Sequence, residues 1–351
     1  MEDEKKPEIV NNTEVLEQAK PAIEEIEEKP DAFVDEEVSF VYESSIKIKE
    51  EITKVIVGQE QVIDLLLSAL YVDGHILLEG VPGIAKTLLA KLFARTMSVG
   101  YSRVQFTPDL MPTDVTGTMV FDNNSSTFNF RKGPVFSNLV LIDEINRAPA
   151  KTQAALFEVM QEKQISIDGQ TYKMEEPYMI MATQNPIEQE GTYKLPEAQL
   201  DRFTYRLKLN YPELEDEKLI LRRFKNKTDK TASEDVSSVI DSADVLRIKK
   251  IVNEVEISDQ LLDFIANIIV NTRNNADIFL GASSRASLAI MNSSKAIAAI
   301  RGRNFVTPDD IKYVAKHVMN HRIILNSDLE IEGVSTEEVI DSILSKIEIP
   351  R

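Results

Sequence analysis

The sequence predicts an α/β domain built on a five-stranded parallel sheet between helices, followed by an all-α domain. Two observations predict this order. Up to about residue 224, short apolar runs alternate with helical segments, whereas from residue 244 onward only helical periodicity remains. The apolar runs are also continuous rather than alternating, which is typical of parallel strands that are covered on both faces. A polar stretch at 225–243 separates the two patterns and is expected to be a linker.

The elements of the first part follow from these runs. The five expected strands are short and apolar, and they lie at 75–78, 103–106, 139–142, 178–182 and 205–209. Helices are expected at 86–97 and 152–161, where apolar residues recur at helical spacing.

The second part begins with expected helices at 257–272 and 285–300. Another helix should start after Thr307, because Thr caps, Pro308 suits the first turn and the following aspartates suit the positive helix end. Ser335 and Glu338 form a capping box for a last helix.

Charge is distributed unevenly along the 351 residues. The formal net charge is −18, and the chain contains no Cys and no Trp. Residues 1–38 hold 14 acidic residues and four lysines, a net charge of −10, so the remaining residues carry only −8. A segment this polar cannot bury enough apolar surface to offset its ordering entropy. We therefore expect residues 1–38 to be an acidic, disordered tail.

Composition excludes several classes of protein. Without cysteine there is no disulfide framework, thiolate nucleophile or zinc finger, and three scattered histidines do not make a metal cage. An acidic chain is not expected to coat nucleic acid, which requires a basic face. The start, Met1-Glu2-Asp3-Glu4, lacks the features of a signal peptide, and charged residues interrupt every long apolar run. We expect a soluble cytoplasmic protein with no membrane span.

A glycine-rich turn between the first strand and its helix predicts a phosphate-binding loop. The segment matches G-x-x-x-x-G-K-[ST] except that Ala85 stands where the second glycine is usual. Backbone N–H groups of such a turn surround phosphates, Lys86 reaches the β- and γ-phosphates, and Thr87 places its hydroxyl on Mg²⁺. If residue 85 needs a left-handed backbone, alanine costs on the order of 1 kcal/mol. The residues expected to bind nucleotide here are Gly80, Val81, Pro82, Gly83, Ile84, Ala85, Lys86 and Thr87.

Acidic residues follow the third expected strand. Asp143 ends this apolar run, so its carboxylate is expected near the Mg²⁺, and Glu144 can act as a base that activates water. Asn185 ends the fourth strand and suits the holding of the attacking water. Arg202 and Arg285 are candidates for neutralising charge on the transferred phosphoryl group. Together these residues predict hydrolysis of a nucleoside triphosphate.

One further pattern is interpreted as chance. Residues 226–229 read Asn-Lys-Thr-Asp, which fits the guanine-selecting N-K-x-D pattern of GTPases. In GTPases the pattern follows an apolar strand, whereas in this sequence it follows a helical segment and lies in a polar stretch.

As a set, these motifs resemble the MoxR family of AAA+ ATPases over about residues 45–325. The resemblance rests on the loop GVPGIAKT, on VQFTPDLMPTDVTG, on GPVFSNLVLIDEINRAP, on ATQNPIEQEGTYKLPEAQLDRF and on GASSRASLAI. Loops of this family commonly have alanine at the position of Ala85. Ser284 departs from the family, which usually has proline there. The resemblance implies an AAA+ core at 39–224 and a helical lid domain at 244–351.

The resemblance also implies a role for each candidate residue. It implies a hexameric ring with ATP and Mg²⁺ at the subunit interfaces, in which Lys86 and Thr87 belong to Walker A. Residues Asp143 and Glu144 then belong to Walker B, and Asn185 is sensor 1. The remaining assignments are Arg202 as an arginine finger for the neighbouring subunit, Arg285 as sensor 2, Arg147 as an interface or nucleotide-sensing arginine, and Gln105 as a residue coupling Glu144 to the ring.

Two insertions are expected to be working parts of such a machine. Residues 110–134 resemble the helix-2 insert of this branch of the family. Residues 164–173 predict a hairpin before sensor 1, because Asp168-Gly169 is a strong two-residue turn signal.

The leading functional hypothesis is ATP-driven, chaperone-like remodelling, maturation or activation of a partner protein complex. The resemblance implies a partner with a von Willebrand factor A (VWA) domain, while the client stays unidentified. The alternatives are a magnesium-chelatase-type motor subunit, a nucleic-acid motor or loader, and a nucleotide-sensing scaffold that hydrolyses little. The 164–173 segment contains one basic residue, which disfavours nucleic acid.

Overall fold

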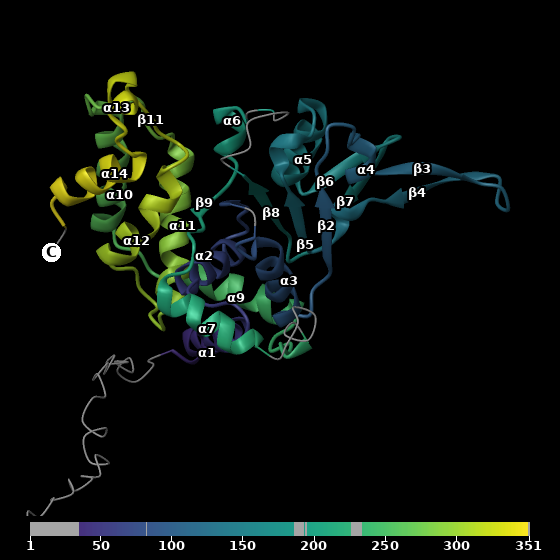
Figure 1. The fold of residues 1–351 in the computed structure, drawn as a ribbon, viewed down its shortest axis with the longest axis horizontal. Helices are drawn as coiled ribbons and strands as arrows, with labels where there is room; N and C mark the ends of the chain where they lie inside the picture. The colour runs from purple at the N-terminus through teal and green to yellow at the C-terminus, as the bar shows by residue number, and fades with distance from the viewer. Residues whose placement is uncertain (1–34, 82, 186–192, 194, 226–233, 350–351) are drawn as a thin grey trace, which may run out of the picture. The chain divides into compact units, whose positions relative to one another are not determined.

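Five parallel strands form the central sheet of the computed structural model, which describes residues 35–81, 83–185, 193, 195–225 and 234–349. Their order is β2-β5-β8-β1-β9, and every neighbouring pair is parallel (Figure 1). The strands are β1 (Ile76–Glu79), β2 (Tyr101–Gln105), β5 (Leu139–Asp143), β8 (Met179–Gln184) and β9 (Tyr205–Lys208). The predicted fold class, a five-stranded parallel sheet with helices followed by a helical region, is confirmed.

Both faces of the sheet are covered by helices, which explains why the strands are continuous apolar runs. One face packs with α1 (Glu36–Thr53), α2 (Glu60–Tyr71) and α3 (Lys86–Thr96), and the other packs with α5 (Ala150–Glu162). Along β5, Leu139 and Leu141 belong to the first apolar cluster, whereas Val140 and Ile142 belong to the second. This alternation follows from the two-residue period of a strand.

Helix α1 begins earlier than the expected end of the acidic tail at residue 38. The Asp35 carboxylate accepts a hydrogen bond from the backbone N–H of Glu37, at 2.9 Å, and so caps the helix at Glu36. Val38 is buried in the apolar cluster. The acid-rich sequence therefore includes the first turn of α1, while residues 1–34 lie outside the described part of the chain.

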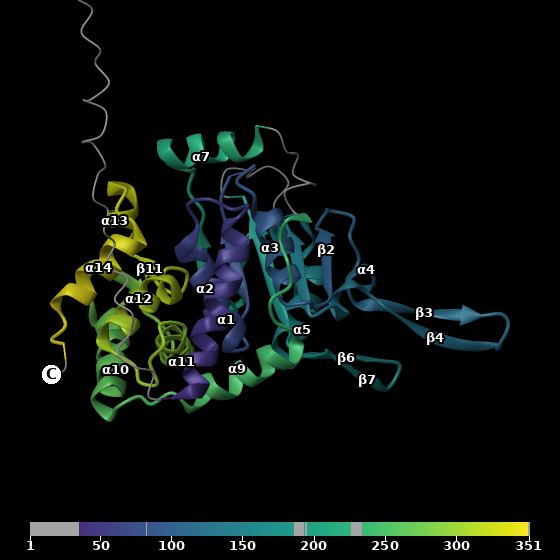
Figure 2. The same cartoon turned by 90° about the horizontal axis from the view of Figure 1, so that it is seen from below.

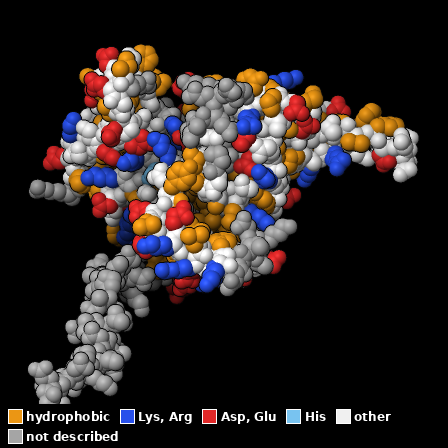
Figure 3. All heavy atoms as spheres, in the orientation of Figure 1, with side chains coloured by type: hydrophobic (Ala, Val, Ile, Leu, Met, Phe, Trp, Pro, Cys, Tyr) orange, Lys and Arg blue, Asp and Glu red, His pale blue; other side chains and the backbone are white. Residues whose placement is uncertain are grey.

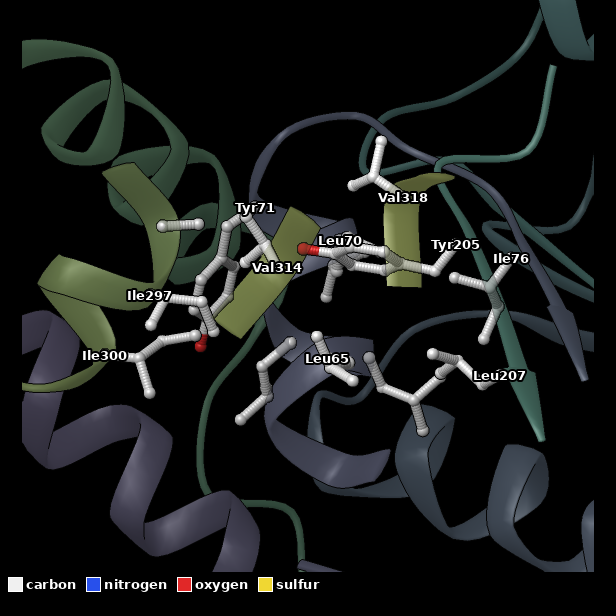
Figure 4. Close-up of a cluster of buried hydrophobic side chains, with 14 of the residues drawn as sticks. Leu65, Leu70, Tyr71, Ile76, Tyr205, Leu207, Ile297, Ile300, Val314 and Val318 are labelled. Carbon is white, nitrogen blue, oxygen red and sulfur yellow. The ribbon is translucent and has the colours of Figure 1, made fainter. Parts of the chain in front are cut away.

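The second part of the chain is helical and shares its core with the sheet. Its elements are α9 (Ser242–Glu254), α10 (Asp259–Asn274), β10 (Ile278–Leu280), α11 (Ser284–Ile300), α12 (Pro308–Met319), β11 (Ile324–Leu325), α13 (Ser327–Glu332) and α14 (Thr336–Lys346). In Figure 4, Ile297 and Val314 of this region lie in one apolar cluster with Tyr71 of α2 and Tyr205 of β9. The boundary expected at residue 244 stays a prediction. Helix α9 starts two residues before it, because Asp241 and Asp244 form a capping box.

Two antiparallel hairpins leave the same side of the molecule (Figure 2). The first consists of β3 (Gly117–Asp122) and β4 (Thr127–Lys132), preceded by the short helix α4 (Pro112–Thr116), and occupies the expected insert at 110–134. The second consists of β6 (Gln164–Ile167) and β7 (Gln170–Lys173). Its turn residues Asp168 and Gly169 both have positive φ, 51° and 77°, as a type I′ turn requires.

Four shorter or outlying elements complete the described part of the chain. They are α6 (Glu197–Leu200), α7 (Leu214–Phe224) and two 3₁₀ turns at Pro134–Phe136 and Ile145–Arg147. Among the described residues, no helix combines the length and apolarity needed to cross a bilayer.

Candidate active site

The predicted phosphate loop connects the end of β1 to the start of α3. Its backbone turns through two residues with positive φ, Gly83 at 88° and Ala85 at 63°, and the helix begins at Lys86. A Cβ at Gly80 would clash with the end of the Ile84 side chain and lie 3.0 Å from the Leu209 carbonyl oxygen, so a larger residue would have to displace its neighbours. Ala85 thus adopts the left-handed conformation that the usual glycine would adopt. Val81 and Ile84 lie in the loop, and Pro82 is outside the described residues.

The register of the sheet brings the loop beside the acidic residues. Glu79 of β1 is paired with Gln184 of β8, and Ile142 of β5 is paired with Ala182 of β8. The three strands therefore end at one edge, which we call the carboxyl edge. There the Thr87 hydroxyl donates a hydrogen bond to Oδ2 of Asp143, at 3.3 Å.

This pair fits a magnesium site. Asp143 is buried, with 5% of its surface exposed, and it shares one oxygen with the Thr87 hydroxyl at the mouth of the phosphate loop. Mg²⁺ in nucleotide sites usually takes one or two protein oxygens and completes its octahedron with waters and phosphates. Thr87 and Asp143 can supply those two oxygens.

Glu144 is held in an unusual backbone conformation directly after β5. Its φ is 57°, a left-handed value that is uncommon outside glycine and clusters at functional sites. The Thr183 hydroxyl accepts a hydrogen bond from the Glu144 backbone N–H at 3.0 Å and donates one to Oδ1 of Asp143 at 3.1 Å. Thr183 thus connects both acidic residues to β8. Sequence reasoning assigned it no role, because the sequence does not show that β8 lies beside β5.

Side chains from β2 and from the turn after β5 contact the same carboxylates. Gln105 Nε2 donates to Oε2 of Glu144 at 2.9 Å, and Arg147 Nε pairs with that oxygen at 2.9 Å. Arg103 Nε pairs with Oδ2 of Asp143 at 2.6 Å. Gln105 thus contacts Glu144, the residue to which the sequence linked it, whereas Arg147 was expected only as an interface or nucleotide-sensing arginine and its contact with Glu144 was not anticipated. Arg103 was missed, because a strand sequence alone does not say which neighbouring strand a side chain will meet.

Asn185 follows β8, which lies between β5 and β1 in the sheet. Its side chain is buried at the carboxyl edge, between the strand that leads to Asp143 and the strand that leads to the phosphate loop. Residues 186–192, which follow it, are outside the described part.

Arg202 and Arg285 lie elsewhere. Arg202 precedes β9, whose first residue, Tyr205, is paired with Ile76, the first residue of β1. It therefore lies at the opposite, amino edge of the sheet, and β1 alone spans about 13 Å at about 3.3 Å per residue. Arg285 lies on the same side, because its Nη1 is 3.6 Å from Oδ2 of Asp201.

The two arginines share one cavity of 260 Å³ with Met160, Gln161 and Asp201. Arg202 Nη1 donates to the carbonyl oxygen of Phe157 at 3.1 Å and to Oε1 of Gln161. The structure thus divides the expected site residues into two groups. One group, at the carboxyl edge, comprises the phosphate loop, Asp143, Glu144 and Asn185, and the other, at the amino edge, comprises Arg202 and Arg285.

Comparisons with known proteins agree with this architecture. Residues 75–205 match the family described as ATPase family associated with various cellular activities (AAA), and residues 270–343 match the AAA lid domain. A solved structure of a Cytophaga hutchinsonii protein provisionally classed as an ATPase is 43% identical, with a TM-score of 0.83, covering 90% of this chain and 98% of that one.

Two curated relatives extend over most of the chain. Chaperone MoxR1 of Mycobacterium tuberculosis is 41% identical over 310 residues, which are 86% of this chain and 81% of the relative. The uncharacterized protein YeaC of Bacillus subtilis is 40% identical over 304 residues, which are 87% of this chain and 94% of the relative. Identity at this level over most of the chain indicates common ancestry and is not confined to the phosphate loop. The chain therefore belongs to the MoxR family of AAA+ ATPases.

Proposed function

We propose that the protein hydrolyses ATP to ADP and phosphate at the carboxyl edge of its sheet. The observation that carries the proposal is the placement of Glu144 immediately beside the Thr87–Asp143 pair, at the mouth of the phosphate loop. The loop amides and Lys86 bind the phosphates, Thr87 and Asp143 hold Mg²⁺, and Glu144 accepts the proton of the attacking water. Asn185 orients that water from the end of β8. Bound Mg²⁺ neutralises charge on the β- and γ-phosphates.

The arrangement of the arginines supports a homo-oligomeric ring, most simply a hexamer, with one nucleotide between each pair of subunits. Arg202 and Arg285 lie at the amino edge of their own sheet, so a nucleotide they contact belongs to a neighbouring copy. Contact between the amino edge of one subunit and the carboxyl edge of the next is heterologous, and repetition of such a contact forms a ring when the rotation between subunits closes.

Helix α7 supplies a surface that suits this contact. It follows β9, so it leaves the sheet from the carboxyl edge, and none of its residues is buried. Figure 2 shows it as an outlying helix. Leu214 and Leu221, seven residues apart on one helical face, are each 70% exposed. An exposed apolar face of this kind is typical of an interaction surface.

We further propose that the work done by hydrolysis is chaperone-like remodelling, maturation or activation of a partner protein complex in the cytoplasm. Support comes from the relative named Chaperone MoxR1 and from the hairpin β3–β4, which exposes Phe121 and Phe128 away from the sheet. Figure 3 shows apolar side chains along this projecting hairpin. A partner with a VWA domain follows from the family resemblance, and the client is not identified.

The first test is hydrolysis by Glu144→Gln. This variant should bind ATP with near wild-type affinity but lose steady-state turnover by at least about a hundredfold, as loss of a general base does. ATP binding is measured by equilibrium titration and turnover by phosphate release. Full turnover in Glu144→Gln would assign the base to another residue.

A second test addresses the shared site. Neither Lys86→Ala nor Arg202→Ala should hydrolyse ATP alone, but their equal mixture should, because random assortment joins an intact loop to an intact arginine at about a quarter of the interfaces. A mixture that forms mixed oligomers, as shown by affinity tags of two kinds, but stays inactive would refute the role of Arg202 in a neighbouring site.

A further inference from the structure

Arg322 lies three residues after the end of α12 and is almost completely buried, with 4% of its side chain exposed. Its guanidinium binds the short segment 201–204 that leads into β9. Nε donates to Oδ1 of Asp201 at 2.7 Å, and Nη2 donates to the carbonyl oxygens of Asp201 and Phe203 at 3.0 and 2.6 Å. Nη1 donates to the carbonyl oxygens of Thr204 and Val318, at 3.1 and 2.6 Å.

The bound segment is the one that contains Arg202. Arg322 thus holds the backbone immediately before and after Arg202, from a residue 120 positions further along the chain. A planar guanidinium presents its donors in a rigid fork, so these bonds fix the direction of the segment as well as its position. His321 contributes one more bond, from Nε2 to the Phe203 carbonyl oxygen at 3.0 Å.

The carboxylate of Asp201 is divided unequally among the arginines of the cluster. Oδ1 of Asp201 accepts the hydrogen bond from Arg322 Nε. Oδ2 of Asp201 lies 3.6 Å from Arg285 Nη1 and accepts a long hydrogen bond from the Ser283 hydroxyl at 3.4 Å. Arg202 Nη1 donates to uncharged acceptors on α5, the Phe157 carbonyl oxygen and the Gln161 side chain. The guanidinium groups of Arg322 and Arg285 therefore share the Asp201 carboxylate, and Arg322 has the closest oxygen.

We propose that Arg322 is a positioning residue for ATP hydrolysis: it holds the segment 201–204 so that Arg202 meets the nucleotide of the neighbouring subunit. This inference rests on the proposed function of Arg202. The bonds also tie Arg202 to the end of α12, so a shift of the helical region relative to the sheet moves the arginine. Burial of a guanidinium requires such complete hydrogen bonding, and loss of the fork leaves carbonyl oxygens of the segment unpaired.

The test uses Arg322→Lys, which retains the charge and loses the fork. Its homogeneous oligomers should bind ATP as the wild type does but turn over at least about tenfold more slowly, since misplacement by about 1 Å costs up to about a hundredfold. Wild-type turnover by this variant would overturn the proposal.

Subunit mixing separates positioning from a general structural defect. An Arg322→Lys subunit still has an intact phosphate loop, so mixing it with Lys86→Ala, whose Arg202 and Arg322 are intact, should restore hydrolysis. Mixing it with Arg202→Ala should not, because the mixture then lacks a correctly placed Arg202. Equal rescue by both partners, or rescue by neither when mixed oligomers form, would overturn the proposal.

Two further measurements keep the outcomes distinct. The reference mixture of Lys86→Ala with Arg202→Ala tests the proposed function alone, so its failure would point to Arg202 and not to Arg322. Arg301→Lys is the matched control, because Arg301 pairs with Asp310 at 2.9 Å, elsewhere in the helical region, and should behave as the wild type in both mixtures. If Arg322→Lys does not fold, Asp201→Asn replaces it, because this variant keeps the bonds from Arg322 to the backbone. It should be rescued more by Lys86→Ala than by Arg202→Ala, with a smaller difference than for Arg322→Lys. Equal rescue by the two partners would contradict the proposal.

Discussion

The Gln105 side chain donates a 2.9 Å hydrogen bond to the same oxygen of Glu144 that Arg147 contacts. The proposed base is thereby held by an amide from β2 and a guanidinium from the turn that follows β5. Both contacts occupy an oxygen that would otherwise be open to water, and they fix the direction of the carboxylate. Gln105 and Arg147 are therefore suited to restrain Glu144 until the neighbouring subunit or a client alters their contacts.

Gln105→Leu should release part of this restraint. A hydrogen bond to a charged group contributes about 1.5–3 kcal/mol, and this one is exposed and therefore weaker. We expect basal turnover to rise by roughly three- to tenfold at saturating ATP, which corresponds to about 0.7–1.4 kcal/mol. The measurement is steady-state phosphate release at fixed oligomer concentration. Gln105→Glu, which replaces the donor by a like charge, is expected to alter turnover more strongly, and unchanged turnover in both variants would show that Gln105 does not restrain Glu144.

Thr183 should be needed for catalysis although it bears no charge. In Thr183→Val the Glu144 backbone N–H loses its 3.0 Å acceptor and Asp143 loses a 3.1 Å donor, while the side-chain volume is kept. We expect kcat to fall by about tenfold to a hundredfold, because small displacements of catalytic groups are costly. Thr183→Ser retains the hydroxyl and should stay near the wild type. Equal losses in the two variants would show that the shape of the side chain, and not its hydroxyl, sets the rate.

The exposed leucines of α7 should contribute to subunit association. Replacing both Leu214 and Leu221 by glutamate should lower the fraction of oligomer at a given protein concentration, as measured by analytical ultracentrifugation, and lower turnover with it. The unfolding temperature of the monomer should not change, because neither side chain is buried. Ile331→Glu is a control at an 85% exposed position on α13. Unaltered association of the α7 variant would remove this face from the interface.

Acid should destabilise the protein through its buried histidines. Burial lowers the pKa of His75 to about 4 and the pKa of His321 well below its ordinary value of 6.5. The unfolded chain therefore binds more protons than the folded one below about pH 6.5, so the stability that the neutral histidines contribute is present above that pH and is lost as pH falls toward 4. For His75 alone the loss reaches up to about 3 kcal/mol, at about 1.4 kcal/mol per pKa unit.

Urea unfolding at a series of pH values measures this effect. His75→Gln can still accept from the Ile180 N–H and donate to the Met160 carbonyl oxygen, which bind the two ring nitrogens at 3.0 Å each. It should be less stable at pH 7 but show a shallower decline between pH 6.5 and 4. A slope equal to that of the wild type would show that His75 does not take up a proton on unfolding.

Much of the architecture was predictable from local patterns. The apolar runs at 139–142 and 178–182 became β5 and β8, and the capping sequences at Thr307 and Ser335 begin helices α12 and α14. The extra first turn of α1 was not predictable from composition, since Glu36 and Glu37 read as part of an acidic tail. Their helical conformation depends on a cap at Asp35 and on the burial of Val38.

The candidate site was predictable only in part, for a related reason. The residue types of the phosphate loop, Asp143 and Glu144 follow from chemistry that acts over a few residues. The contacts of Thr183 and Arg103 depend on which strands become neighbours. Parallel strands are joined through long crossovers, so their order and register come from packing of the whole sheet.

The sequence by itself determined the family, the alternation of strands and helices, and the residues available for binding a nucleoside triphosphate. It could do so because periodicity and loop composition are local properties. The tertiary structure alone decided that Arg202 and Arg285 lie at the opposite edge of the sheet from Lys86, and that Arg322 holds the segment 201–204 from 120 residues away. Both are spatial relationships between segments that are far apart in the sequence. They are set by the burial of apolar faces against one another, and no local pattern encodes them.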